Sequence, residues 1–189
     1  MKLFSFAFAA VLSLASFAGA AFAQSGNTLT IQLKDGPVVI QLMPDVAPKH
    51  VAQIEALAKK GAYDNVAFHR VIEGFMAQTG DVKFGNMEKG FDASRAGTGG
   101  SDLPDLPAEF SKTPFVRGTV GMARSQDPNS ANSQFFIMFA DGSFLNGQYT
   151  VVGKVVSGME NVDKIKRGEG QNGEVSNPDR MIKVTVGSK

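Results

Sequence analysis

The 189-residue sequence predicts a mainly β domain, a closed eight-stranded antiparallel β-barrel capped by two α-helices. Two observations lead to this fold class. About eight short runs have the composition, or the alternation of polar and apolar residues, that is typical of strands. By contrast, only one segment carries a long apolar stripe at helical spacing. Many short strands with one or two helices are typical of an antiparallel barrel whose ends are closed by helices.

The composition is that of a globular protein. Hydrophobic residues make up 43% of the chain, charged residues make up 20%, and the formal net charge is +1. Because nucleic-acid-binding domains are normally basic, this balance argues against that function. The sequence contains no cysteine, which excludes disulfides, thiolate metal sites and cysteine nucleophiles.

The first 23 residues predict a secretory signal peptide. Lys2 supplies a short positive region, residues 3–18 are uncharged and mostly apolar, and a small-residue processing motif ends at Ala23. The alternative is a retained membrane anchor, but the apolar stretch is short for a membrane span and is interrupted by serine. We expect cleavage after Ala23, which leaves residues 24–189 as the folded domain. That domain would be exported, to a periplasm or to the outside of the cell.

The folded domain begins with a predicted β-hairpin. Polar and apolar residues alternate over residues 28–33, and apolar residues share one face of a second strand over residues 38–42. The Asp-Gly pair at 35–36, which lies between them, is a strong hairpin signal.

A long amphipathic helix follows. Pro48 suits the first helical position, Asp45 lies near the positive end of the helix, and Gly61 suits the position just after its last turn. The apolar stripe consists of Val51, Ile54, Leu57 and Ala58. We interpret this stripe as a surface that packs against the core.

The rest of the chain predicts short strands around one irregular segment. The further strands are expected over residues 67–71, 75–79, 119–123, 134–139, 150–156 and 181–186. Gly153 predicts a bulge or bend, and residues 159–165 predict a second, shorter helix. Residues 80–110 are rich in glycine and proline, and an irregular stretch of this length is usually functional or disordered.

Residues for nucleophilic or metal chemistry are scarce. The sequence has two histidines, His50 and His69, and their spacing supports neither a metal site nor a catalytic triad. A metal site that adds Asp81 is conceivable, but nothing in the spacing favours it. We therefore expect no metal and no cofactor, and a secreted hydrolase is disfavoured because it would need such groups.

Three segments are more informative: FHRVIEGFMAQTGD at 68–81, GMARS at 121–125 and SQFFI at 133–137. Each of them alone is typical of a barrel strand. Together with GTGG at 97–100 and VVGKVV at 151–156, and in this order, they resemble the cyclophilin family of peptidyl-prolyl cis-trans isomerases. The resemblance covers essentially the whole domain. It implies an eight-stranded antiparallel barrel with two helices, in agreement with the pattern of strands.

The resemblance also implies a site. Arg70 corresponds to the catalytic arginine of the family. Four apolar side chains would line a pocket for the proline ring: Phe75, Met76, Phe136 and Leu145. Gln78 and Gln134 would support the substrate backbone and Arg70. The substrate peptide would lie along the strand edge formed by Ala123, Arg124 and Ser125.

Three residues of this implied site depart from a common family pattern. Arg124 stands where many members have asparagine, but the contact there is largely made by the backbone. Phe144 and Tyr149, which we also place in the substrate site, replace the tryptophan and histidine common in eukaryotic members. Both changes resemble bacterial exported members. They lower the expectation of strong binding to cyclosporin-type inhibitors but not the expectation of isomerase activity. Residues 82–95 extend beyond the family minimum and carry no motif.

The expected function is that of a peptidyl-prolyl cis-trans isomerase, or rotamase, that assists the folding of exported proteins. Its partners would be proline-containing peptides and unfolded exported proteins. We expect no nucleic-acid partner, no membrane partner after signal cleavage, and a monomeric state. The alternative is a binding module or chaperone that holds proline-containing peptides, with turnover incidental.

Overall fold

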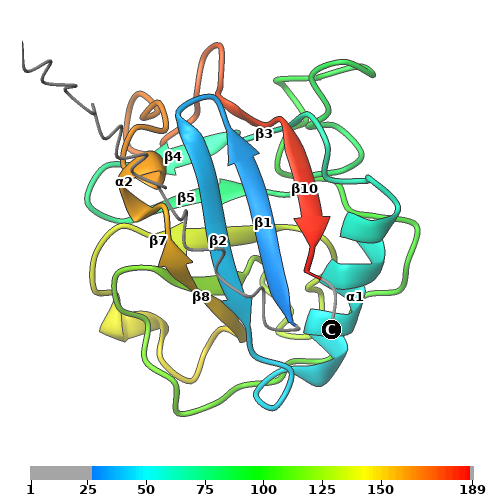
Figure 1. Ribbon diagram of the computed structural model, residues 1–189, viewed down its shortest axis with the longest axis vertical. Helices are drawn as coiled ribbons and strands as arrows, with labels where there is room; N and C mark the ends of the chain where they lie inside the picture. Colours follow the sequence, from blue (N-terminus) through cyan, green and yellow to red (C-terminus); the bar gives the residue numbers. More distant parts are fainter. Residues whose placement is uncertain (1–26, 188–189) are drawn as a thin grey trace, which may run out of the picture.

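The computed structural model describes residues 27–187, so the predicted signal peptide and its cleavage site lie outside the described residues. Eight strands form one antiparallel sheet with the order β10-β1-β2-β8-β6-β7-β5-β4, and β3 pairs with β9 in a small second sheet (Figure 1). The strands are β1 (Thr28–Leu33), β2 (Gly36–Leu42), β3 (Val66–Ala67), β4 (Arg70–Ile72), β5 (Met76–Thr79), β6 (Thr119–Met122), β7 (Phe135–Met138), β8 (Val151–Ser157), β9 (Arg180–Met181) and β10 (Lys183–Val186).

The large sheet is strongly curled but open, so the prediction of a closed barrel is wrong. The two edge strands, β4 and β10, do not pair with each other. Residues 168–175 occupy the outer edge of β4 instead. The Val71 N–H donates to the Gly173 carbonyl (2.7 Å), and the Val71 carbonyl accepts from the Gly168 N–H (2.8 Å). Because these backbone groups are already satisfied, β4 has no free edge with which to close onto β10.

Two of the predicted strands are each divided in two. The strand expected over residues 67–71 becomes β3 and β4, because the chain turns aside where the Phe68 N–H donates to the Asp179 carbonyl (2.8 Å). The strand expected over 181–186 becomes β9 and β10. The predicted irregularity at Gly153 is confirmed, because the pairing of β6 with β8 shifts register next to this residue.

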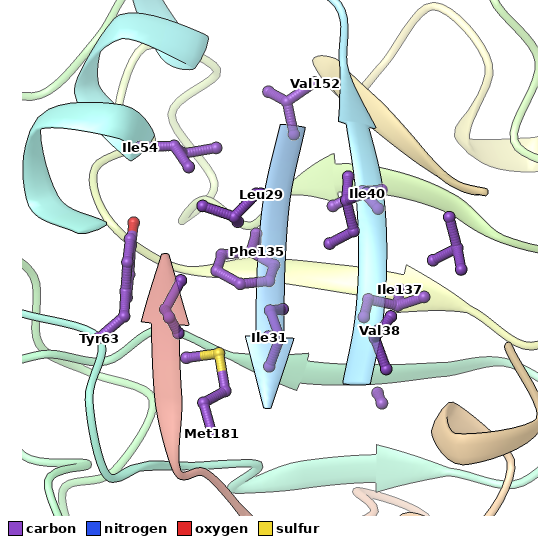
Figure 2. Packing of buried hydrophobic residues seen from close by; sticks show 14 of the residues in the cluster. Leu29, Ile31, Val38, Ile40, Ile54, Tyr63, Phe135, Ile137, Val152 and Met181 are labelled. Carbon is purple, nitrogen blue, oxygen red and sulfur yellow. The ribbon is translucent and has the colours of Figure 1, made fainter. Parts of the chain in front are cut away.

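The main core fills the concave side of the curled sheet (Figure 2). Leu29 and Ile31 of β1 lie opposite Ile40 and Val38 of β2, and Phe135 of β7 approaches them from across the interior. All five side chains are at most 1% exposed. The alternation seen in the sequence of the first hairpin therefore separates the buried face from the exposed face, as expected for a half-buried sheet.

Two helices cover parts of this sheet. Helix α1 (Pro48–Lys59) packs against β10, and α2 (Met159–Val162) packs against β2 (Figure 1). The first helix matches the prediction, and Gly61 follows it with a left-handed φ of +68°. The second helix ends earlier than residues 159–165 suggested. A short 3₁₀ turn, η1 (Ser143–Leu145), follows β7. Within residues 27–187, no helix is both long and apolar enough to cross a membrane.

The first helix is capped from a distant part of the chain. Its N-cap residue, Ala47, supplies no side-chain hydrogen bond. Glu109 caps the helix instead, because its carboxylate accepts hydrogen bonds from the N–H groups of Lys49 and His50 (3.2 Å each). The same carboxylate contacts Nδ1 of the buried His50 ring at 2.7 Å. A carboxylate at the start of a helix is favoured by the helix dipole. The acidic residue suggested by the sequence, Asp45, makes no such contact.

Replacing Glu109 by glutamine should destabilise the fold by about 1 kcal/mol at neutral pH, in the range of lost helix caps. Burial alone would raise the pKa of Glu109, but the hydrogen bonds from His50 and Lys49 outweigh this effect and hold it below the ordinary value of 4.5. The stabilisation by the charged carboxylate is therefore complete above pH 4.5 and is lost as the pH falls through the lowered pKa.

Urea unfolding at a series of pH values measures this difference. The control is Glu55→Gln, which removes a half-buried carboxylate of the same helix that pairs with the exposed Lys59 (3.3 Å) and caps no backbone group of the helix start. We expect the control to change the free energy of unfolding by less than about 0.5 kcal/mol. An equal effect of both substitutions at neutral pH would contradict the capping role of Glu109.

Candidate active site

Strand pairing places a row of side chains across the face of the sheet opposite the main core. Arg70 of β4 pairs with Gln78 of β5, and Gln78 pairs with Phe136 of β7. The residues next to them along these strands, such as Val71 and Ala77, belong to the main core. Because successive strand residues point to opposite faces, the three paired residues share the other face. The register therefore assembles a cation, an amide and an aromatic ring side by side.

The guanidinium of Arg70 is held in place by a chain of hydrogen bonds. Its Nε donates to the Asn172 carbonyl (2.9 Å), and its Nη1 donates to Oε1 of Gln78 (3.2 Å). Nε2 of Gln78 donates in turn to Oε1 of Gln134 (3.0 Å). No residue in the described part of the chain forms an ion pair with Arg70 or accepts a hydrogen bond from its Nη2. The side chain is thus oriented while part of its donor capacity stays available.

A hollow of about 370 Å³ lies beside Arg70, and most of the residues that line it are apolar or aromatic. We refer to it below as the apolar hollow. It brings together ten of the twelve residues assigned to the site from the sequence: Arg70, Phe75, Met76, Gln78, Ala123, Arg124, Phe136, Phe144, Leu145 and Tyr149. Gln148 also lines it, although no motif or pattern in the sequence pointed to this residue. The other two assigned residues, Ser125 and Gln134, line an adjoining hollow of about 360 Å³.

Aromatic rings form the walls of the apolar hollow. The Phe136 ring stacks on Phe115, with the ring centroids 5.7 Å apart, and meets the edge of Tyr149 at 5.9 Å. The rings of Phe75 and Phe144 lie 5.5 Å apart, and Phe144 is 64% exposed. A ring at the rim that is this exposed can contact a bound peptide. The sequence did not identify Phe115, which supports Phe136 from behind.

Arg124 is fixed at the border between the two hollows. Its guanidinium lies over the Tyr149 ring, 4.4 Å from the ring centroid. Its Nη1 donates to the Ser125 carbonyl (2.8 Å), and its Nη2 donates to the Gln148 carbonyl (3.0 Å). The Arg124 side chain therefore joins the strand edge to the loop that carries Tyr149.

The residues that line the apolar hollow include two arginines and no described acidic or histidine side chain. His69 lines a separate hollow of about 660 Å³, which shares Arg70 and Gln78 with the apolar hollow. Burial lowers the pKa of the His69 imidazole below its ordinary value of 6.5, by more than the nearby Asp81 carboxylate raises it. His69 is therefore uncharged at neutral pH and lies outside the apolar hollow.

The three residues considered as metal ligands, His50, His69 and Asp81, do not form one group, because His50 lies apart at Glu109. Within residues 27–187, no three His, Asp or Glu side chains form a group that could hold a metal ion. His50 contacts Glu109, and His69 lies in the hollow beside Arg70. What the structure assembles is therefore a fixed guanidinium beside an apolar wall, which can bind a small apolar ring and place a hydrogen-bond donor next to it.

Comparison with known proteins relates this chain to a family. The family model described as cyclophilin type peptidyl-prolyl cis-trans isomerase/CLD matches residues 28–186. A probable peptidyl-prolyl cis-trans isomerase of Brucella suis is 72% identical over 176 residues, which cover 93% of this chain and 90% of that protein. Peptidyl-prolyl cis-trans isomerase B of Escherichia coli is 37% identical over 146 residues, which cover 73% of this chain and 83% of that protein.

Solved structures agree with the sequence comparison. A cyclophilin from Hirschia baltica superimposes with a TM-score of 0.70 at 27% identity, covering 85% of this chain and 73% of that one. A cyclophilin-type isomerase from Cryptosporidium parvum, whose crystal structure was determined in the presence of the dipeptide Ala-Pro, gives a TM-score of 0.72 at 26% identity. That match covers 86% of this chain and 99% of the other. This chain belongs to the cyclophilin family of peptidyl-prolyl cis-trans isomerases and is itself such an isomerase.

Proposed function

We propose that Arg70 accelerates rotation of the X-Pro bond by donating a hydrogen bond to the proline nitrogen while the amide is twisted. The barrier of ~18–20 kcal/mol arises because C–N conjugation is lost at the twisted state. The nitrogen then becomes pyramidal and gains a lone pair that the planar ground state lacks. A fixed donor aimed at that lone pair binds the transition state more tightly than the substrate, which is the requirement for catalysis. No bond breaks, so the step needs no nucleophile, base or metal.

One observation carries this proposal: the Arg70 guanidinium is held at Nε and Nη1 directly beside the apolar hollow. Arginine suits the task because it stays charged and presents a planar fork of donors. The aromatic walls would hold the proline ring while the preceding carbonyl turns. Phe136 and Met76 in the hollow are 5% and 2% exposed, so these walls are firmly packed.

Exchange NMR on a short Ala-Pro peptide tests the proposal. Residues 24–189 at catalytic concentration should increase the cis–trans exchange rate well above the uncatalysed value, which corresponds to tens to hundreds of seconds. Arg70→Ala measured in the same way should lose most of this increase. Binding of the peptide without faster exchange would instead favour a module that holds proline-containing segments.

The catalysed rate should be nearly constant from pH 6.5 to about 9, because arginine remains protonated far above this range. His69 is the titratable group nearest to Arg70 in sequence, and because burial lowers its pKa below 6.5, its imidazole is mainly uncharged over this interval. Hydrolytic chemistry that depends on histidine or paired carboxylates would give a bell or a steep limb.

The measurement is the exchange rate across this interval, with the fold checked by circular dichroism at each pH. A tenfold change that follows one ionisation, and that disappears in His69→Gln, would show that proton transfer or the charge of His69 takes part. The mechanism proposed above would then be incomplete.

We further propose that the natural substrates are exported proteins and that the isomerase assists their folding. The support is the signal-peptide pattern of residues 1–23. Expressing the chain in a bacterial host and separating periplasm, medium and cytoplasm tests the export on which this proposal depends. We expect a shortened protein that begins near residue 24 outside the cytoplasm, whereas a full-length protein retained in the cytoplasm would contradict export.

A further inference from the structure

Asp81 lies two residues after the end of β5, the strand that carries Gln78. It is fully buried and accepts four backbone hydrogen bonds. Oδ1 accepts from the N–H groups of Lys83 (3.1 Å) and Phe84 (2.9 Å), and Oδ2 accepts from those of Gly97 (2.8 Å) and Gly99 (2.9 Å). The carboxylate therefore joins both ends of the loop formed by residues 85–96. Only an ionised carboxyl group accepts at both oxygens and donates at neither.

The glycines of the GTGG segment permit this contact. A Cβ atom on Gly99 would lie 2.5 Å from Oδ1 of Asp81, which is closer than real Cβ contacts allow. Gly97 has a φ of +97°, in the region that side chains disfavour. This segment could be assigned from the sequence only through its resemblance to a family. The structure gives it a local role, which is to direct two N–H groups at Asp81.

The same segment continues the contact toward the apolar hollow. The carbonyls of Gly97 and Gly99 accept both hydrogen bonds from Nε2 of Gln134 (3.0 and 2.7 Å). With its amide nitrogen bound in this way, Gln134 must present Oε1 to Gln78, and Gln78 must present Oε1 to Arg70 (3.2 Å). Each amide thus has a single orientation that satisfies its neighbours. The series of hydrogen bonds that sets these orientations begins at the Asp81 carboxylate.

We propose that Asp81 is a positioning residue for Arg70. Its carboxylate fixes the backbone of residues 97–99, whose carbonyls orient Gln134, which orients Gln78 and so places the guanidinium. This inference rests on the catalytic role proposed above for Arg70. The alternative is that Asp81 only stabilises the loop, in which case its loss would lower the melting temperature without changing the catalytic constants of the folded enzyme.

The test compares Asp81→Asn with Asp92→Asn. The amide has nearly the same shape as the carboxylate, but its NH₂ group would face backbone N–H groups that need an acceptor. Asp92 is the matched control, because it lies in the same loop and accepts hydrogen bonds from Ser94 but has no link to Gln134. For a short Ala-Pro peptide, we expect kcat/KM of Asp81→Asn to fall roughly tenfold, mainly in kcat, since small misplacements of a catalytic group are costly. Asp92→Asn should stay within about twofold of the wild type.

Two further readouts separate positioning from stability alone. The NMR signal of the Arg70 Nε–H should shift or broaden in Asp81→Asn but not in Asp92→Asn. The fall in kcat/KM caused by Asp81→Asn should also be much smaller in a Gln134→Ala background than in the wild type, because both substitutions interrupt the same chain of contacts. If Asp81→Asn does not fold, Gly99→Ala displaces the same segment and should give the same fall in kcat/KM.

A folded Asp81→Asn enzyme with wild-type kcat/KM, or fully additive effects with Gln134→Ala, would overturn the positioning role. Failure of the proposed mechanism looks different. If Arg70→Ala retains wild-type activity, the catalytic role of Arg70 is wrong whatever Asp81 does. If Arg70→Ala is inactive while Asp81→Asn is not impaired, only the role of Asp81 is wrong.

Discussion

Replacing Arg70 by alanine should slow catalysed cis–trans exchange, because it removes about 2–4 kcal/mol of transition-state stabilisation. This is the range found when a fixed donor to a developing charge is lost. Each ~1.4 kcal/mol corresponds to a factor of ten in rate. Affinity for a short Ala-Pro peptide should fall much less, because the aromatic walls of the apolar hollow remain. The effect should therefore appear mainly in the rate of exchange of bound peptide, which line-shape analysis of the NMR spectra separates from binding.

Arg95→Ala is a matched control for this prediction. Arg95 also lies over an aromatic ring, with its guanidinium 3.7 Å from the Phe84 centroid, and it lines neither the apolar hollow nor the adjoining one. Its removal changes the net charge by the same amount and should leave the peptide exchange rate close to that of the wild type. If Arg70→Ala weakens binding and turnover in equal measure while the fold survives, Arg70 binds substrate and the proposed mechanism is wrong.

Replacing Phe136 by alanine should weaken both stability and peptide binding. The ring is 5% exposed, stacks on Phe115 and meets Tyr149 edge-to-face, so its loss leaves a cavity that costs about 3–5 kcal/mol of folding free energy. It also forms a wall of the apolar hollow, so the affinity for a proline-containing peptide should fall with it. Urea unfolding and titration calorimetry measure the two effects separately.

The neighbouring Phe135 separates packing from binding. It is 1% exposed and belongs to the main core on the opposite face of β7, where its ring meets the edge of Tyr63 at 5.6 Å. Phe135→Ala should lose a similar amount of stability but keep its peptide affinity under conditions in which it is folded. Unchanged affinity in Phe136→Ala would show that Phe136 acts only as a core residue.

Local periodicity was enough to predict most of the elements. Alternation over residues 28–33 and 38–42 predicted the first hairpin, and the stripe from Val51 to Ala58 predicted α1. Alternation also anticipates which face each strand residue occupies, because the side-chain period of a strand is two. The residues of β4, β5 and β7 therefore divide cleanly between the main core and the face that carries Arg70, Gln78 and Phe136.

The composition of the site came from the resemblance to a family, and the structure brings ten of those twelve residues to one hollow. Their catalytic and binding roles remain predictions that the substitutions above test. The supporting contacts were not predictable from the pattern. The carbonyl that fixes Nε of Arg70 belongs to Asn172, 102 residues away, and Glu109 caps a helix that begins 61 residues earlier at Pro48.

The sequence by itself indicated the buried face of the first hairpin, where α1 begins and ends, and the strands that carry Arg70, Met76, Gln78 and Phe136. The tertiary structure alone decided that the sheet stays open, that Asp81 closes the loop at 85–96, and that Asn172 reaches Arg70. The reason is physical. Periodicity, and with it the buried face of an element, depends on residues that are neighbours along the chain. The partner of a strand edge, a carboxylate or a guanidinium is a distant segment that folding brings within hydrogen-bonding distance.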